Sequence, residues 1–294
     1  MVFCRLACNN SFCLLLLINQ ANNQELKIYI QGVQNLIRQS VFYAALIAAF
    51  VVVACGDDSN PAVENYQKKS WDFLNPDIKY GEMKDKRDGQ IYKTVQIGDQ
   101  VWMAENLNYE VKDSYCLKKS ADNCDKLGRL YTWGAAMDSA GVFSSDGKGC
   151  GYTKFCSPKF PVRGVCPEGW HLPDYGEWDR LLTAVVECDP DVACENGPLE
   201  TLMSKKDMNV KNNLNGENNT DDFGFSAVSA GYMHDSPEQF YSGGAYFWSS
   251  TEYDGDGEYS GKYDAYSVMH NSHVFYLDYN LCKCSGYSVR CVKD

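Results

Sequence analysis

The chain has 294 residues, of which 22% are charged, and this length suits one large domain or two small ones. Its net charge of −12 disfavours binding to nucleic acid or to an anionic bilayer surface, because both are negatively charged. The 14 cysteines indicate disulfide bonds in an oxidising compartment, and the lack of any C-x-x-C pair disfavours zinc as the alternative.

The first 55 residues are expected to hold an N-terminal extension and a lipoprotein signal peptide. Arg38 precedes an apolar run at residues 41–54, and a polar segment follows Cys55. The run is short for a transmembrane helix, but this order of charged, apolar and cleavage regions is typical of a signal peptide. Residues 52–55 resemble the lipobox of bacterial lipoproteins, in which the cysteine is lipidated and becomes the new N-terminus. The resemblance implies a lipid anchor on Cys55 and a membrane-anchored protein at the outer membrane or cell surface.

Residues 56–87 are polar with few aliphatic side chains, so we expect a flexible tether there and a folded domain at residues 88–294. At the start of the domain, residues 90–97 alternate between apolar and polar types. Residues 101–103 follow after a Gly-Asp turn. This pattern predicts an antiparallel hairpin.

A helix is predicted to begin after Asp174. Asp174 and Glu177 have the spacing of a capping box, in which each side chain accepts a hydrogen bond from the backbone N–H of the other residue. Apolar residues then recur at i, i+3, i+4, i+7 and i+8, which form one face of a helix. A short apolar strand at residues 170–172 precedes the helix and ends at Pro173. The apolar helix positions are Trp178, Leu181, Leu182, Val185 and Val186.

The C-terminal part of the chain is predicted to be rich in strands. Residues 223–231 alternate between apolar and small polar types, and residues 245–251 are largely aromatic and β-forming. Residues 266–269 and 274–277 are expected to form a hairpin around Asn271. The whole pattern indicates an α+β domain with few helices and long loops.

Three short loops are each bracketed by two cysteines. The spacing of the first pair, Cys116 and Cys124, suits a local disulfide. Cys282 and Cys284 are separated by one residue, which leaves open that they bond elsewhere and re-pair the other two loops. The cysteines of those loops are Cys150 and Cys156, and Cys188 and Cys194.

Six segments between residues 88 and 294 occur in a recognisable order. They read DGQIYKTVQIGDQVWMAENLNY, GRLYTWGAAM, GVCPEGWHLPDYGEWDRLL, DDFGFSAVSAGY, YFWSSTE and SVRCVKD. Together they resemble the Fibrobacter succinogenes major paralogous domain, a family grouped with C-type-lectin-like folds. The resemblance implies a disulfide-stapled, C-type-lectin-like domain of short antiparallel strands. Because such domains pair a cysteine near a helix with one on the last strand, it also implies a Cys166–Cys291 disulfide.

Candidate ligand-binding residues lie in the loops between residues 216 and 264. Exposed tyrosine rings can stack on sugars or protein partners, and packing within a sheet is the alternative. An acidic, Gly-rich segment offers oxygen ligands that suit Ca²⁺, and a solvated acidic turn is the alternative. The tyrosines are Tyr246, Tyr253, Tyr259 and Tyr263, and the acidic residues are Asp254, Asp256, Glu258 and Asp264.

The sequence contains no Ser-His-Asp order, nucleophile elbow or H-E-x-x-H helix, so no catalytic residue is predicted. The expected function is non-enzymatic binding or adhesion at the cell surface, with a polysaccharide or a surface protein as partner. A glycan-active enzyme and a structural component of the envelope are the alternatives. No cofactor other than calcium is expected.

The lipobox generates the first prediction. Cys55→Ala removes the thiol that would carry the lipid, so the protein should leave the membrane fraction or accumulate as an unprocessed precursor. Membrane fractionation combined with mass spectrometry of the mature N-terminus checks this. A variant that stays anchored and is processed like the wild type would contradict the lipid anchor.

Overall fold

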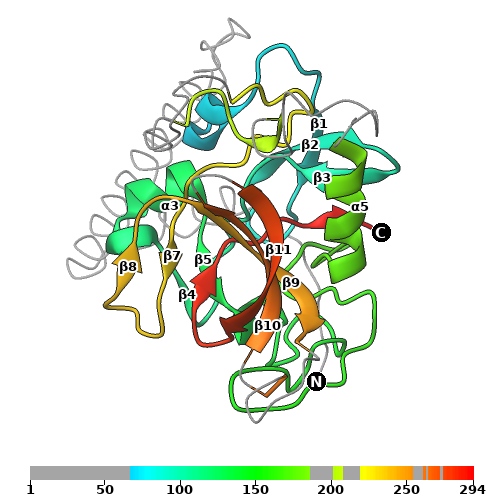
Figure 1. Ribbon diagram of the computed structural model, residues 1–294, viewed down its shortest axis with the longest axis vertical. Coiled ribbons are helices and arrows are strands. Elements are labelled where there is room, and N and C mark those ends of the chain that lie inside the picture. Colours follow the sequence, from blue (N-terminus) through cyan, green and yellow to red (C-terminus); the bar gives the residue numbers. More distant parts are fainter. Residues whose placement is uncertain (1–66, 186–200, 208–218, 254–260, 263, 272–273) are drawn as a thin grey trace, which may run out of the picture. The chain divides into compact units, whose positions relative to one another are not determined.

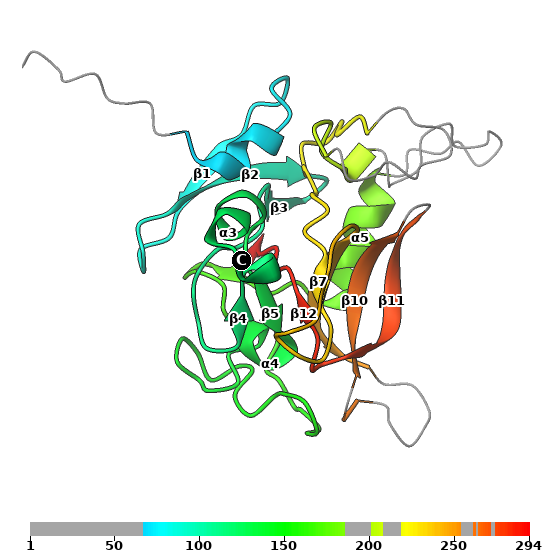
Figure 2. The ribbon, with the colours of Figure 1, turned by 90° about the vertical axis from the view of Figure 1, so that its left-hand side faces the viewer.

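A computed structural model describes residues 67–185, 201–207, 219–253, 261–262, 264–271 and 274–294. Within them, short strands form three sheets, accompanied by a few short helices (Figures 1 and 2). In this part of the chain no helix has the length and apolar character needed to cross a bilayer. The strands are β1 (Gly81–Lys84), β2 (Ile91–Ile97), β3 (Gln100–Met103), β4 (Ser114–Tyr115), β5 (Leu130–Thr132), β6 (Trp170–His171), β7 (Tyr232–Met233), β8 (Phe240–Tyr241), β9 (Ala245–Glu252), β10 (Asp264–Asn271), β11 (Val274–Cys282), β12 (Gly286–Tyr287) and β13 (Val292–Lys293). The helices are η2 (Lys69–Phe73), η3 (Leu117–Lys119), α3 (Ala121–Leu127), α4 (Trp133–Ala136) and α5 (Tyr175–Val185).

The first sheet has the strand order β1-β2-β3-β13-β6 and contains the predicted hairpin. β2 and β3 are antiparallel, with Ile97 opposite Gln100 across the turn, which confirms the hairpin expected from the alternating pattern. β13 follows the other strands in sequence but lies between β3 and β6. Val292 is opposite both Trp102 and His171. The C-terminal strand is therefore an internal strand of this sheet.

The folded region begins earlier than the composition predicts. β1 pairs with β2 along its whole length, and the η2 helix before it contacts Glu105, whose side chain is 1% exposed. The Glu105 carboxylate accepts hydrogen bonds from Ser70 Oγ at 2.5 Å and from Trp71 Nε1 at 3.0 Å. The expectation of a tether is therefore wrong for residues 67–87. Polar side chains that suggested a tether instead satisfy a buried carboxylate.

The predicted capping box is present at the start of α5. Asp174 Oδ1 accepts from the Glu177 N–H at 2.8 Å, and Glu177 Oε2 accepts from the Asp174 N–H at 2.9 Å. The ring centroid of Trp178 lies 4.7 Å from that of Trp102 on β3 and 5.6 Å from that of Phe247 on β9. The helix therefore packs against both the first sheet and β9 (Figure 1). The buried side chains of its apolar face are Trp178, Leu181 and Val185.

The second sheet has the order β11-β10-β9, and the third has the order β4-β5-β12-β7-β8. In the second, Asn271 is opposite Val274, which confirms the predicted hairpin. The two sheets meet at the buried Trp248. Its backbone N–H donates to Ser288 O at 3.1 Å, and its indole N–H donates to Tyr131 O on β5 at 2.6 Å.

Residues 223–231 do not form the predicted strand. Gly224, Ser226 and Gly231 have φ values of 70°, 51° and 65°. These positive values lie outside the β region that the residues of a strand adopt. The Asp221 carboxylate accepts from the Ser226 N–H at 2.7 Å and from Ser226 Oγ at 2.6 Å. Bonds between a side chain and the local backbone therefore replace a strand ladder. The alternating sequence pattern reflects the burial of an irregular segment.

Three of the predicted disulfides are present. The sequence left the partners of Cys282 and Cys284 undecided, and in the structure these two cysteines bond to each other. Cys188 and Cys194 lie outside the described residues. The confirmed disulfides are Cys116–Cys124, Cys150–Cys156 and Cys166–Cys291, the last of which joins residues 125 positions apart.

His171 on β6 is buried between two carboxylates. Its Nε2 lies 2.9 Å from Glu177 Oε1, and its Nδ1 lies 2.7 Å from Asp294 Oδ1. Burial lowers the pKa of His171, but the hydrogen bonds with both carboxylates outweigh burial and raise the pKa above its ordinary value of 6.5. For the acid Glu177 the signs are reversed. Burial raises its pKa, but the hydrogen bonds with His171 and with the Asp174 N–H outweigh burial and lower the pKa below 4.5.

These opposite shifts predict how stability depends on pH. The contribution of His171 is complete below its unfolded pKa of 6.5 and is lost as pH rises through the raised folded pKa. The contribution of Glu177 is complete above 4.5 and is lost as pH falls through the lowered folded pKa. His171→Gln should therefore lose more unfolding free energy at about pH 6 than at about pH 9, by on the order of 1 kcal/mol. Urea denaturation of both proteins at the two pH values measures this difference. Equal losses at both pH values would contradict the prediction.

Candidate functional site

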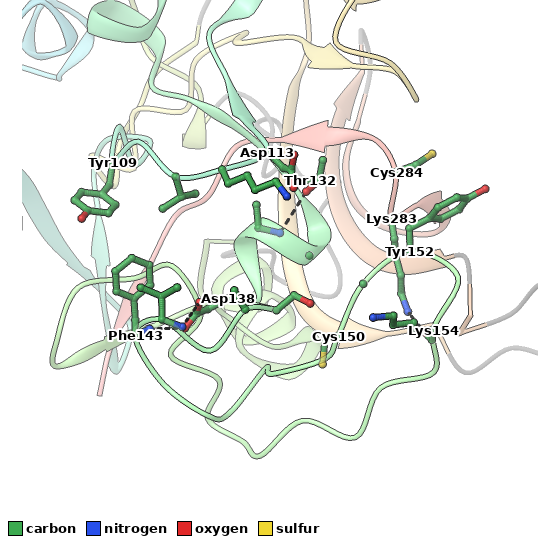
Figure 3. A pocket seen from close by; sticks show the side chains of 18 of the residues that line it. Tyr109, Asp113, Thr132, Asp138, Phe143, Cys150, Tyr152, Lys154, Lys283 and Cys284 are labelled. Atoms are coloured by element: carbon green, nitrogen blue, oxygen red, sulfur yellow. Dashed lines mark hydrogen bonds between the residues drawn. The ribbon is translucent and has the colours of Figure 1, made fainter.

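A hollow of about 730 Å³ opens between segments that are distant in the sequence (Figure 3). Residues 109–113 precede β4, residues 132–143 include α4, and residues 150–154 belong to the loop closed by the Cys150–Cys156 disulfide. Residues 283–284, between β11 and β12, complete the wall. The hollow therefore depends on the tertiary fold rather than on one local motif.

Two aromatic rings are fixed at one end of the hollow. The rings of Tyr109 and Phe143 meet edge to face, with their centroids 5.8 Å apart (Figure 3). The Arg87 guanidinium lies 3.9 Å from the Tyr109 centroid and 4.8 Å from that of Phe143. Arg87 is itself held by Asp85 at 2.7 Å and by the carbonyl of Val165 at 2.8 Å. The two rings are thus positioned by a cation that has little freedom to move.

A buried carboxylate holds the rim beside these rings. Asp138 is 5% exposed and has a φ of 54°. Its carboxylate accepts the backbone N–H groups of Val142 at 2.8 Å, Phe143 at 2.6 Å and Ser144 at 3.0 Å. The turn after α4 therefore has a fixed conformation, because three amide groups point at one charge.

A buried lysine holds the opposite end. The Lys283 side chain is 0% exposed, and its ammonium donates to the carboxylate of Glu252 and to the carbonyls of Gly261 and Lys154. It also lies 4.3 Å from the centroid of the Trp133 ring. Burial lowers the pKa of Lys283, and the carboxylate of Glu252 opposes this shift. One ammonium thus joins the loop around residue 154 to the segment at residue 261.

The loop at residues 142–160, which Asp138 and Lys283 hold, exposes large apolar side chains. Gly147 lies so close to residue 137 that an added Cβ would be 2.0 Å from its carbonyl oxygen, so the loop requires glycine there. Three lysines of this loop, Lys148, Lys154 and Lys159, are also exposed. The loop therefore presents both apolar and cationic side chains to solvent. Its exposed apolar residues are Val142 (71%), Tyr152 (47%), Phe155 (73%) and Phe160 (54%).

The described tyrosines of the predicted ligand set lie in separate clusters. Tyr246 on β9 is half-buried, with its ring centroid 4.8 Å from that of Tyr232 and 5.5 Å from that of Tyr287. Tyr253 instead packs against Tyr266, at 5.5 Å. The structure therefore does not bring Tyr246 and Tyr253 together, and both rings take part in packing.

Most other predicted site residues lie outside the described residues. These are Cys55, Tyr259, Tyr263, Asp254, Asp256 and Glu258. Asp264 begins β10, where burial raises the pKa of its carboxyl group. Among the residues that the structure describes, no group of three His, Cys, Asp or Glu side chains is placed to hold a metal ion.

The hollow itself was not predicted from the sequence. The signal that could have pointed to it is the Gly-rich loop closed by Cys150 and Cys156, because a short disulfide-closed loop with Tyr152 and Phe155 must expose some of its side chains. The buried partner of that loop, Lys283, comes from a distant part of the chain and donates to the Lys154 carbonyl.

The structure defines a class of protein: a disulfide-linked α+β domain of short antiparallel strands with a rigid, partly apolar loop beside a hollow. A family model for the Fibrobacter succinogenes major domain matches residues 95–293, and the chain belongs to this family. No curated protein and no solved structure matches the chain.

The Asp138 turn generates a prediction for the rim of the hollow. Asp138→Ala removes three charge-assisted hydrogen bonds, so local opening should become easier by about 2 kcal/mol. Amide hydrogen exchange at residues 142–144 should then be roughly 30-fold faster. Asp146→Ala in the same loop is the matched control, because the described bonds of Asp146 involve its backbone. Unchanged exchange in Asp138→Ala would show that other contacts hold the rim.

Proposed function

We propose that this protein is an exported lipoprotein, anchored through Cys55, whose C-type-lectin-like domain binds polysaccharide in the hollow. Four disulfides among the described residues support an oxidising compartment. The disulfide between Cys166, near α5, and Cys291, beside β13, agrees with the pairing expected for a C-type-lectin-like fold. An outer-membrane or cell-surface location follows from the lipobox and this cysteine chemistry.

The observation that carries the binding proposal is the pair of fixed ends of the hollow. Tyr109 and Phe143 are held by Arg87 at one end, and the loop that carries Tyr152 is held through Lys283 at the other. Binding to surfaces that are already ordered costs less conformational entropy. An open hollow with aromatic walls and polar edges can therefore stack sugar rings without first rearranging.

Polysaccharide fits the hollow better than nucleic acid does. The lining carries exposed side chains of both charges, the acidic Glu110 and Asp113 and the basic Lys112 and Lys154. The chain as a whole carries −12, which opposes a phosphate backbone. Hydroxyl groups of a sugar can pair with both signs of charge, whereas a polyanion needs an excess of cations.

A surface protein is the second candidate partner, and a different observation favours it. Phe155 and Phe160 are 73% and 54% exposed. They are not among the residues that line the hollow. Exposed phenylalanines on a rigid loop are suited to insertion into a pocket of another protein. Such a partner would be lost on Phe155→Ser, while polysaccharide binding in the hollow would remain.

The test compares two tyrosines of similar exposure. Tyr152, at the hollow, is 47% exposed, and Tyr241, on β8, is 50% exposed. On a glycan array, Tyr152→Ala should weaken binding by about tenfold, or about 1.4 kcal/mol, whereas Tyr241→Ala should bind like the wild type. Equal losses in the two variants would place the binding surface elsewhere.

Three further outcomes separate the alternatives. Release of reducing ends from a bound glycan would identify a glycan-active enzyme. Retention of a cell-surface protein that depends on Phe155, without glycan binding, would identify the protein partner. An envelope defect on deletion, with no ligand on the array, would indicate a structural component.

A further inference from the structure

The Cys282–Cys284 disulfide lies beside the hollow, and it closes the smallest loop of the described disulfides. The two cysteines are separated by one residue, and their Cα atoms are 5.1 Å apart. Both are partly exposed, and Cys284 lines the hollow. Figure 3 shows Cys284 at the same end of the hollow as Lys283 and Tyr152. We propose that this disulfide is a redox site, which exchanges with a thiol that enters the hollow.

The two sulfur atoms have different surroundings, and this difference assigns their roles. The backbone N–H of Cys284 donates to Cys282 Sγ, with a distance of 3.2 Å from N to Sγ. A hydrogen bond of this kind stabilises a thiolate on Cys282 and makes that sulfur the better leaving group. Cys284 is the residue that the hollow exposes. An incoming thiolate therefore attacks Cys284 Sγ.

The proposed exchange needs two thiol groups and no other reactant. The first thiolate attacks Cys284 Sγ, the Sγ–Sγ bond breaks, and Cys282 leaves with the electron pair as a thiolate. A second thiolate then attacks the incoming sulfur of the mixed disulfide and releases Cys284 as a thiolate. The two entering thiols are oxidised to one disulfide, the cysteine pair gains two electrons, and both thiolates take up protons from water according to pH.

The residue between the cysteines keeps the pair in place after reduction. Lys283 is fixed by its buried ammonium, as described above, and the Ser285 N–H donates to the Cys282 carbonyl at 2.9 Å. The backbone on both sides of Cys282 and Cys284 is therefore restrained without help from the disulfide. Reduction should leave the two thiols close together, and an oxidant can join them again.

Each of the other three described disulfides contains at least one buried cysteine. Cys166 and Cys291 are both 0% exposed, and Cys150 is 1% exposed. Cys124 is 4% exposed, but the Arg129 guanidinium lies 3.6 Å from its Sγ and favours a thiolate. Cys116 and Cys156 are partly exposed, and Cys150 also lines the hollow. The experiment must therefore exclude both Cys116–Cys124 and Cys150–Cys156 as the disulfide that reacts first.

The test treats the full chain with reduced glutathione, followed by acid quenching and mass mapping of each cysteine pair. Cys282–Cys284 should be reduced at least about tenfold faster than Cys116–Cys124, Cys150–Cys156 and Cys166–Cys291. The trapped glutathione should be on Cys284. Earlier reduction of Cys116–Cys124 or Cys150–Cys156, or glutathione on Cys282, would overturn the proposal.

Two matched double variants give an independent measurement. Wild-type protein should form oxidised glutathione in a fast phase. Replacement of both Cys282 and Cys284 by alanine should abolish this phase, whereas the same replacement of Cys116 and Cys124 should preserve it. A fast phase that survives the first replacement would overturn the proposal. Loss of polysaccharide binding would not affect it, because it depends only on thiol access to the hollow.

Discussion

The buried guanidinium of Arg290 is the interaction on which the rest of the domain depends. It is 0% exposed, and burial lowers its pKa to about 9. It donates to Asn106 Oδ1 at 2.7 Å, to the Met103 carbonyl at 3.3 Å, to the Ser226 carbonyl at 3.0 Å and to the carbonyl of Phe225. A buried charge is tolerated only when its donors are satisfied. The end of β3, the irregular segment after residue 221 and the approach to β13 must therefore all be in place around it.

The loops around the hollow follow the same physical rule on a smaller scale. Asp138 gathers three amide groups, and Lys283 gathers a carboxylate and two carbonyls. Each of these buried charges orders a stretch of chain that has no regular secondary structure. This arrangement explains how a domain with short strands can present a rigid surface. Long loops are rigid here because their polar groups are bonded to fixed charges.

Features that arise from nearby residues were predicted correctly from the sequence. The capping box of α5, the β2–β3 hairpin and the Cys116–Cys124 disulfide each depend on residues within one short segment. Features that depend on distant partners were not. Docking of residues 67–87 requires Glu105, and the hollow needs Lys283 beside a loop more than a hundred positions earlier in the chain. The irregular path at residues 223–231 shows that alternation of apolar and polar residues indicates burial but does not guarantee a strand. Positive φ values within the segment prevent a strand from forming.

The place of β13 in the first sheet has a consequence for how the chain acquires its structure. The neighbours of β13, β3 and β6, are synthesised earlier, but they do not pair with each other and are connected within the sheet only by β13. Arg290 and Cys291 immediately precede β13. A chain that emerges N-terminus first therefore has no closed sheet until its C-terminal segment arrives. Until then, Trp102 has no partner strand on one side. The first sheet therefore stays in two separate parts during synthesis, and its assembly is one of the last steps in the folding of the chain.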